Sequence, residues 1–557
     1  MKSITSKDNY NLLYFLLAAV YLVGLFIPLM ENDSAQHATM AMQIYLDNDF
    51  LHLFKGGIPY LDKPHMHFWL SAISFKIFGI SHIAYRLPAI LFTAIGAYSC
   101  YKLAKEFYGE HAAQIAPLIF LSTYAIILAN HDVRTDAVLT GASIWSVWQL
   151  VRYIHTSQLK YLVVGAFAAA IAFSCKGHLS VFITGVVLLA YMAYARKWSA
   201  FFSWKSLLGL VVFGLGILPV VYAYYVQYDL HPELVIEGQR NVSGVKFILW
   251  DQNFNRLTAK GFGENNPDYL FFFHNLLWAF IPWSFIVYLA FFDRIKSLVK
   301  NRLKYEKGLE VLTSVGVIIV LFVISTSKFK LPHYLNSLLP ILSVLVAGFL
   351  INLKDRNSLK TLKTILIVQY VSLTLIAGGV LYLTFWAFGV PSPILLGVLG
   401  LFTVVLVFII KEKMELWRKI IFVSVSYVAI INFCLSTHYY PNIMPFQAGI
   451  QAAEVIEEEG IPTQDVFLLF GKYSWSLDFY TERNTPRIPL DEVKETVKPG
   501  QWLFFYGEDL EAVEGAEIKW NKKFHFKHFR VSKPRIDFLN PNNRTSVLES
   551  AYLVQVK

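Results

Sequence analysis

Long blocks of apolar residues recur along most of this chain, and they constrain its fold more than any other feature. The first block runs from Asn11 to Met30, and about 20 apolar residues are what a helix needs to cross a bilayer core ~30 Å thick. Of the 557 residues, 55% are hydrophobic, and the mean hydropathy is +0.47. These values exclude an ordinary soluble protein. We therefore predict a mainly α-helical protein that crosses a membrane many times.

Length and hydropathy together predict about thirteen transmembrane helices. The predicted spans lie near residues 10–30, 84–104, 112–130, 136–155, 160–175, 178–195, 206–227, 269–291, 309–326, 332–352, 362–385, 391–410 and 419–437. The first is expected to stay in the mature protein, because no small-residue cleavage site follows it.

The distribution of Lys and Arg predicts how these helices are oriented. If the N-terminus is cytoplasmic, the strongly basic loops at residues 292–307, 354–363 and 411–419 all fall on the cytoplasmic side, as the positive-inside rule requires. The net charge of +10 then reflects topology and anionic lipid, and we predict no nucleic-acid partner. An odd number of spans places the C-terminus on the outer side.

The predicted outer loops are longer and carry mixed charges. Two are long, at residues 31–83 and 228–268, and three are short but charged, at 130–136, 175–178 and 327–330. Bases on this side break the positive-inside rule. They indicate either an anion-binding site or ordinary salt bridges at the membrane rim, and the sequence leaves both interpretations open.

The composition changes after His438. Residues 466–471 and 501–507 are typical of buried strands that end at Gly, and residues 448–460 are typical of a helix. We predict a transmembrane domain at residues 1–438, followed by a small extracytoplasmic α/β domain at residues 439–557.

Acids and bases gathered at one membrane face suit the binding of a lipid-linked phosphate. Bases would bind the phosphate, a carboxylate would take a proton, and apolar walls would hold the lipid chain. Charge alone does not distinguish such an enzyme from an ion-coupled transporter or lipid flippase. The predicted span centres are nearly free of charge, which favours chemistry at the surface.

Five short motifs carry a family resemblance. They are DSAQHA at residues 33–38, GIPYLDKPHMHFW at 57–69, RTDAVL at 134–139, FIPWS at 280–284 and SKFKLPHYL at 327–335. In this order, and on one predicted membrane side, they resemble the motifs of GT-C glycosyltransferases. The similarity is greatest to the protein O-mannosyltransferase and aminoarabinose (lipid A) transferase group.

The resemblance implies an inverting transferase in the cytoplasmic (inner) membrane. It would move a sugar from a polyprenyl (undecaprenyl) phosphate donor to a lipid, glycan or protein acceptor on the periplasmic side. The absence of an Asp-x-Asp motif and of a Gly-rich phosphate loop agrees with a lipid-borne donor. An O-antigen ligase or polymerase, a transporter or flippase, and a non-enzymatic envelope scaffold are the alternatives.

The same resemblance implies roles for individual residues. Asp33 and Asp136 would be the catalytic carboxylates, although each could instead cap the helix that follows it. Contacts to the donor phosphate or sugar are implied at Tyr60, Lys63, Arg134, Arg256, Lys330 and Tyr334. For Lys63, pairing with the adjacent Asp62 is the competing interpretation.

The chain also departs from the family pattern. Ser34, Gln36 and His37 stand where Glu, Arg and Tyr are usual, which indicates a different donor sugar or acceptor. Asn253 replaces a family His in the loop that contains Arg256. A divalent metal is the one cofactor that the sequence suggests. Its weak candidate ligands are Asp62, His65 and His67, with a set of polar interfacial residues as the favoured interpretation.

Overall fold

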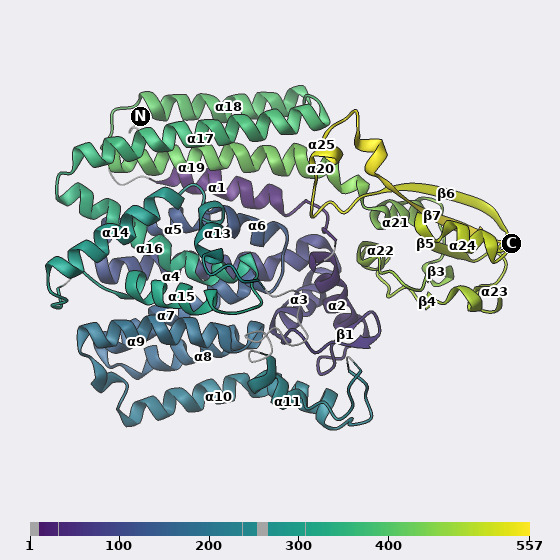
Figure 1. The fold of residues 1–557 in the computed structure, drawn as a ribbon, viewed down its shortest axis with the longest axis horizontal. Helices are drawn as coiled ribbons and strands as arrows, with labels where there is room; N and C mark the ends of the chain where they lie inside the picture. The colour runs from purple at the N-terminus through teal and green to yellow at the C-terminus, as the bar shows by residue number, and fades with distance from the viewer. Residues whose placement is uncertain (1–9, 32, 237, 253–265, 307) are drawn as a thin grey trace.

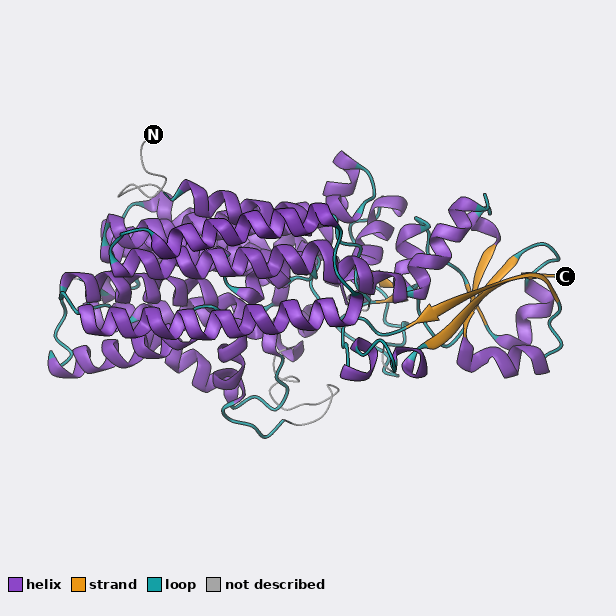
Figure 2. Ribbon diagram, turned by 90° about the horizontal axis from the view of Figure 1, so that it is seen from above, coloured by secondary structure: helices purple, strands orange, loops and turns teal. Residues whose placement is uncertain are grey.

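The computed structural model describes residues 10–31, 33–236, 238–252, 266–306 and 308–557. Long helices lie side by side in a bundle, and a small β-sheet with its own helices extends beyond one end of it (Figures 1 and 2). The bundle helices are α1 (Asn11–Gly24), α4 (His82–Tyr108), α5 (Glu110–Leu121), α6 (Tyr124–His131), α7 (Asp136–Thr156), α8 (Leu159–Lys176), α9 (His178–Ala195), α10 (Trp204–Tyr224), α13 (Phe271–Ala279), α14 (Ser284–Lys300), α15 (Val317–Ser325), α16 (Leu339–Asp355), α17 (Leu359–Phe388), α18 (Pro393–Lys411) and α19 (Leu416–Cys434).

The helices confirm an integral membrane protein. Within the described residues, eight helices are long and apolar enough to cross a bilayer, or nine if α5 and α6, which meet at a 51° bend, form one span. The four other predicted stretches lie on shorter, interrupted or more polar helices. These are α1, α7, the pair α13 and α14, and the segment Leu312–Ser325 that contains α15.

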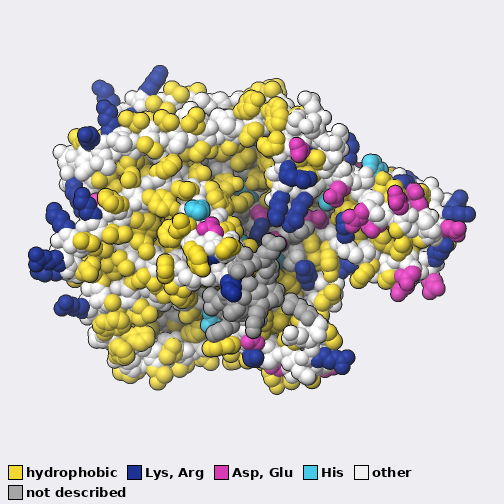
Figure 3. Space-filling model, viewed as in Figure 1, with side chains coloured by type: hydrophobic (Ala, Val, Ile, Leu, Met, Phe, Trp, Pro, Cys, Tyr) yellow, Lys and Arg dark blue, Asp and Glu magenta, His cyan; other side chains and the backbone are white. Residues whose placement is uncertain are grey.

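Burial differs sharply between the helices. The span that ends with α16 is buried along its whole apolar window, whereas those of α10 and α18 are each only 17% buried. Apolar side chains cover the flank of the bundle (Figure 3). Because exposed apolar faces of this size are unfavourable in water, α10 and α18 are placed to contact lipid.

A close helix contact at Gly141 provides a test of this packing. A methyl group added to Gly141 of α7 would lie 2.0 Å from the carbonyl oxygen of Phe92 in α4. We expect Gly141→Ala to lower the free energy of unfolding by about 1–3 kcal/mol, because the two backbones must move apart. The measurement is thermal unfolding of the purified protein in detergent. Gly379→Ala in α17 is the matched control, because nothing lies within 4 Å of its added methyl group; equal effects of the two changes would contradict the packing.

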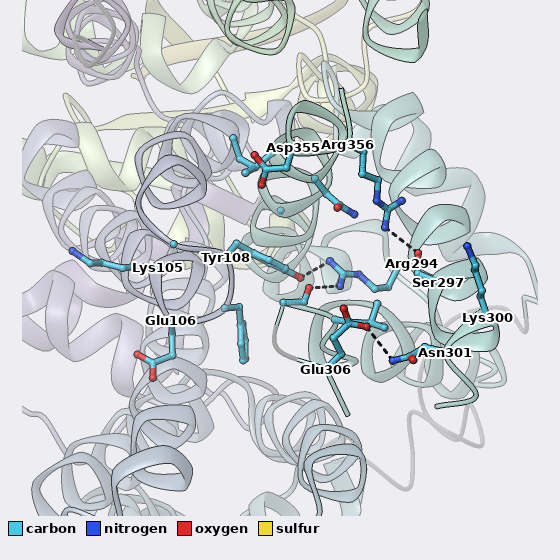
Figure 4. Close-up of a pocket in the computed structure, with 17 residues that line it drawn as sticks. Lys105, Glu106, Tyr108, Arg294, Ser297, Lys300, Asn301, Glu306, Asp355 and Arg356 are labelled. Atoms are coloured by element: carbon cyan, nitrogen blue, oxygen red, sulfur yellow. Dashed lines mark hydrogen bonds between the residues drawn. The ribbon is translucent and has the colours of Figure 1, made fainter. Parts of the chain in front are cut away.

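The two ends of the bundle differ in charge. Lys and Arg cluster at the end away from the sheet (Figure 3), and a cavity of about 710 Å³ lies there beside the last turn of α4 (Figure 4). In this cavity the guanidinium of Arg294 donates to the carbonyl of Gly308 and to the hydroxyl of Tyr108. Protein groups thus bind the buried charge of Arg294, and the hydrogen bond to Tyr108 connects α14 to the end of α4.

Short elements cover the opposite end of the bundle. They are α2 (Asp33–Asp47), the hairpin of β1 (Phe54–Lys55) and β2 (Ile58–Pro59), α3 (Met66–Phe78) and α11 (Gly244–Lys246). The apolar residues of α2 and α3 form one core with Tyr85 of α4 and with Trp475 and Phe479 of α22 (Trp475–Tyr480). This core joins the bundle to the C-terminal part of the chain.

The C-terminal part contains a mixed five-stranded sheet. Its strands are β3 (Val466–Leu469), β4 (Arg487–Ile488), β5 (Trp502–Tyr506), β6 (Trp520–His528) and β7 (Glu549–Val556). Their order is β4-β3-β5-β7-β6, with β3 parallel to β4 and β5, and β7 antiparallel to β5 and β6. Both predicted strands and the predicted helix are present, as β3, β5 and α21 (Ala448–Glu458).

Helices cover both faces of this sheet. α21 packs on one face, and α23 (Val493–Thr496) and α24 (Leu510–Gly515) pack on the other. The core residues of β5 alternate between the two faces, with Phe504 on one side and Leu503 and Phe505 on the other. Two further short α-helices in the described part of the chain are α20 (Tyr440–Ile443) and α25 (Ile536–Leu539).

Candidate active site

A chain of three charged groups lies at the end of the bundle that faces the sheet. Arg134, in the turn between α6 and α7, contacts Asp33 at the start of α2 at 2.8 Å and Asp132 at 2.6 Å. Burial lowers the pKa of Arg134, but the two carboxylates outweigh this and leave its pKa raised. The guanidinium therefore holds the Asp33 carboxylate in place while half of that side chain, 53%, remains accessible.

A second ion pair is buried close by. Lys176, the last residue of α8, donates to Asp136, the first residue of α7, at 2.7 Å, and their side chains are only 1% and 5% exposed. The same ammonium lies 4.7 Å from the centre of the Tyr334 ring. Asp136 thus makes an ion pair. Thr135 occupies the N-cap position of α7, and its side chain makes no cap hydrogen bond.

Two cavities meet at the Asp33–Arg134 pair. Arg134 and Asp136 line a cavity of about 210 Å³ whose other walls come from α6, α13 and the segment Pro332–Leu338. Asp33 lines a separate cavity of about 520 Å³ between α2, the β1–β2 hairpin and the C-terminal sheet. One ion pair therefore stands between a cavity inside the bundle and a cavity beneath the C-terminal part.

Lys63 lies on the loop between the hairpin and α3. Its ammonium contacts the Asp62 carboxylate at 2.9 Å, so the pairing that we treated as the competing interpretation is present. The Tyr60 hydroxyl approaches the same carboxylate at 3.5 Å, which is a weak hydrogen bond at most. The Lys63 side chain stays 16% exposed, so the pairing leaves access for a further anion.

Lys330 and Tyr334, the two predicted site residues in the segment before α16, have different neighbours. The Lys330 ammonium donates to the carbonyl of Asn266 at 2.6 Å and lies 5.6 Å from the Tyr269 ring. Tyr334 instead stacks on Phe272 and faces Lys176. Arg256 and the neighbouring Asn253 lie outside the described residues.

The candidate metal ligands are dispersed. Among the described residues, no group of three or more His, Cys, Asp or Glu side chains is placed to hold a metal ion. His65 packs between Trp69 and Tyr224. Asp62 pairs with Lys63, and the side chains of His65 and His67 are buried.

His67 has a distinct arrangement. Its Nε2 lies 3.1 Å from the Tyr85 hydroxyl, which itself donates to the carbonyl of Val133. Nε2 must therefore carry the proton, and Nδ1 has a lone pair with no donor among the described residues. Burial lowers the pKa of His67 to about 4, which keeps the ring neutral at pH 7. The ring of His37 lies 5.9 Å away, between centroids.

The C-terminal part of the chain makes several hydrogen bonds to the segment just before Asp33. The carboxylate of Glu31 accepts from the backbone N–H and hydroxyl of Ser476 at 2.9 and 2.6 Å, and from the Ser474 hydroxyl at 3.3 Å. The Gln447 amide binds the backbone of both Leu29 and Glu31. The position of Asp33 thus depends on contacts made more than 400 residues later in the sequence.

These hydrogen bonds lead to a prediction for Ser476→Ala. It removes the shortest hydrogen bond to the Glu31 carboxylate, and hydrogen bonds to charged groups contribute about 1.5–3 kcal/mol. We expect faster hydrogen exchange at residues 29–36 and 474–480, measured by mass spectrometry on the full chain. Ser546→Ala, whose hydroxyl bonds only within its own turn, is the control. Unchanged hydrogen exchange in Ser476→Ala would contradict the proposal that these hydrogen bonds hold the segment before Asp33 in place.

The structure also places residues that the sequence analysis left without a role. Lys176 was recognised as an outer-side base, but its partner Asp136 is 40 positions away and could not be paired from spacing. Lys55, Lys472 and Tyr473 line the cavity that contains Asp33. No sequence motif marked these three, because the fold brings the hairpin and the sheet together.

One protein family and three known proteins are similar to this chain. Residues 62–222 match the family described as dolichyl-phosphate-mannose-protein mannosyltransferase. Undecaprenyl phosphate-alpha-4-amino-4-deoxy-L-arabinose arabinosyl transferases from Edwardsiella ictaluri and Pseudomonas aeruginosa (strain UCBPP-PA14) are 23% and 22% identical over 358 residues, or 62% of this chain. The match spans about 60% of the length of these curated relatives.

The fold comparison covers nearly the whole chain. The crystal structure of ArnT from Cupriavidus metallidurans bound to undecaprenyl phosphate superposes with a TM-score of 0.75, covering 98% of this chain and 97% of that one at 16% identity. The apo structure of the same protein gives a TM-score of 0.70. This chain therefore has the ArnT fold and resembles the aminoarabinose transferase group of GT-C glycosyltransferases.

Proposed function

We propose that this protein is a polyprenyl-phosphate-sugar-dependent glycosyltransferase. It transfers a sugar from an undecaprenyl-phosphate-type donor to a hydroxyl of an acceptor outside the cytoplasm, with inversion at the anomeric carbon. The observation that carries the proposal is the Asp33–Arg134 ion pair at the meeting point of two cavities. Two cavities that lie on either side of one ion pair suit a reaction between two substrates that enter from different sides.

In this scheme the donor occupies the cavity inside the bundle. Arg134 lines that cavity, and apolar groups of Ala125, Leu128 and Trp278 form its walls. A guanidinium suits a phosphate because it offers several N–H donors in a fixed plane. Lys176 pairs with Asp136, which lines this cavity, and Lys176 also faces Tyr334. In the proposal these two residues, together with Tyr60, Lys63 and Lys330, contact the phosphate or the sugar.

The chemistry is a single displacement. The acceptor hydroxyl gives its proton to the Asp33 carboxylate as its oxygen attacks the anomeric carbon. The bond between that carbon and the phosphate oxygen breaks from the opposite face, and polyprenyl phosphate leaves with the electron pair. Arg134 and the nearby lysines stabilise the negative charge that develops on the leaving phosphate. Asp136 orients Lys176 toward that charge.

The orientation follows from the same proposal. The basic end of the bundle faces the cytoplasm, and the end with Asp33 and the C-terminal part, residues 439–557, faces the periplasm. All thirteen predicted stretches of residues 1–438 then cross the inner membrane, including the bent pair α5 and α6 and the interrupted pair α13 and α14. Lipid, glycan and protein acceptors remain the classes to test.

A panel of polyprenyl-phosphate sugars tests the function. The purified full chain is mixed with an envelope extract, and release of free polyprenyl phosphate is measured by mass spectrometry for each donor. We expect release from one donor and its loss in Asp33→Asn. If labelled donor instead moves between the leaflets of a vesicle with its sugar–phosphate bond intact, the protein is a flippase and the proposal is wrong.

A further inference from the structure

We infer that residues 530–537, a segment that includes the start of α25, form a membrane-interface anchor that binds anionic phospholipid head groups. The segment belongs to the C-terminal part of the chain, and it contacts the leaflet at the sheet end of the bundle. We call it the anchor segment. The inference concerns the lipid around the chain and not a substrate, so it goes beyond the proposed function and does not depend on it.

The anchor segment lies against the end of a lipid-facing helix. α25 lies beside the end of α17 (Figure 1), and the guanidinium of Arg544 joins the two by donating to the carbonyls of Ala387 and Phe538. Only 28% of the apolar window of α17 is buried inside the protein, which leaves most of it to contact lipid. The anchor segment is therefore next to the edge of the bilayer.

Exposed aromatic rings mark the same level of the molecule. Tyr382 and Trp386 lie in the last two turns of α17, and both are exposed. Tyr and Trp are enriched where a membrane meets water, because each combines an apolar ring with a polar tip. Val390 and Ile394, in the connection to α18 and in its first turn, are exposed as well. The head groups of the leaflet therefore lie close to the anchor segment.

Buried apolar side chains hold the anchor segment in a fixed shape. Phe529, Val531 and Phe538 are buried, and the rings of Phe529 and Phe538 stack with their centres 4.0 Å apart. Between them, the N–H of Lys533 donates to the carbonyl of Arg530 at 3.0 Å and closes a turn. The exposed side chains of the segment are thus carried by an ordered backbone.

These exposed side chains are mostly cationic. Arg530, Lys533 and Arg535 are exposed, and within the part of the chain that the structure describes none of them has an ion-pair partner. Asp537 is the one carboxylate of the segment. Ile536 lies beside these charges and is 66% exposed. Cations without counterions around an exposed apolar side chain suit an interfacial contact, in which the apolar group enters the leaflet and the cations meet anionic head groups.

Quenching of a fluorescent dye by labelled lipids tests the inference without any turnover. The three cysteines of the chain are buried, so a thiol-reactive NBD dye reaches Ser532→Cys in the folded full chain. The labelled chain is placed, one copy each, in phosphatidylcholine nanodiscs that contain an equal small fraction of nitroxide-labelled phosphatidylglycerol or nitroxide-labelled phosphatidylcholine. We expect the quenching constant of the phosphatidylglycerol to be about ten-fold larger, because salt and Asp537 reduce the combined attraction of three cations.

Two triple variants separate this site from general electrostatics. Changing all three cations of the anchor segment to Gln should abolish the preference for phosphatidylglycerol. The matched control removes the same charge at the opposite end of β6, where Lys522 pairs with Glu459, and should keep the preference. It consists of Lys519→Gln, Lys522→Gln and Lys523→Gln. In a separate variant, Ile536→Ser, we expect quenching by both lipids to fall a few-fold, because the apolar contact with the leaflet is lost.

Three results would overturn the inference. The first is equal quenching by the two lipids in the chain that carries only the dye. The second is a preference that survives in the anchor-segment variant or disappears equally in the control. The third is quenching that changes with a second chain in the nanodisc and not with the anionic lipid, which would assign the surface to a second copy of the protein.

Discussion

Asp33→Asn is expected to lower the rate of sugar transfer by about 10³-fold, the middle of the range for loss of a positioned general base. The amide has nearly the same shape as the carboxylate and can still meet Arg134, but it does not accept a proton from the acceptor hydroxyl. The loss should appear in kcat, with donor binding nearly unchanged. The measurement is the steady-state rate of product formation at saturating donor.

Asp132→Asn is the control for this experiment. Asp132 contacts the same guanidinium as Asp33, at 2.6 Å, but it lines the cavity proposed for the donor and not the cavity that contains Asp33. We expect a loss of about ten-fold or less, because this change weakens the placement of Arg134 at the donor cavity and leaves the proposed base, Asp33, in place. If the two variants lose activity equally, Asp33 acts through Arg134 and is not the base.

Lys176→Met is expected to lower the stability of the protein by about 3–5 kcal/mol, the effect of leaving a buried charge without its partner. Asp136 would then keep a carboxylate that is only 5% exposed and has lost its hydrogen bond at 2.7 Å. The effect is measured by heating the protein in detergent and recording the fraction of the protein that stays monodisperse at each temperature.

The double variant Lys176→Met with Asp136→Leu separates a buried charge from general damage. Removing both charges should recover most of the lost stability, because no ion remains without a partner. Lys522→Met breaks an exposed pair and should change stability by less than about 1 kcal/mol. No recovery in the double variant would show that Lys176 contributes through packing, and the charge argument would be wrong.

The sequence predicts the bundle because transmembrane helices depend mainly on local composition. Where other forces act, the prediction is less complete. α7 carries Asp136, Thr140 and Ser143 on buried positions and falls short of the hydropathy of a simple span. The stretch at 269–291 is interrupted between α13 and α14, where the segment Phe280–Trp283 contains Pro282.

The site could be predicted only in part for a related reason. Motifs mark Asp33 and Arg134 separately, but their contact depends on how the turn after α6 meets α2. The bond between Glu31 and Ser476 joins positions 445 residues apart, and no local pattern indicates it. Lys55 lies on a hairpin outside every motif, so its place opposite Tyr473 and Trp475 required the tertiary structure.

The central claim is that a sugar is displaced from its lipid phosphate in one step beside Asp33. The most direct measurement uses a donor labelled with ¹³C at the anomeric carbon and with ³²P in the phosphate, incubated with the full chain and its acceptor. NMR gives the configuration of the product, and thin-layer chromatography counts the released lipid phosphate. The account predicts inverted product and one polyprenyl phosphate per sugar transferred. Retained configuration, or sugar that stays bonded to its phosphate, would contradict it.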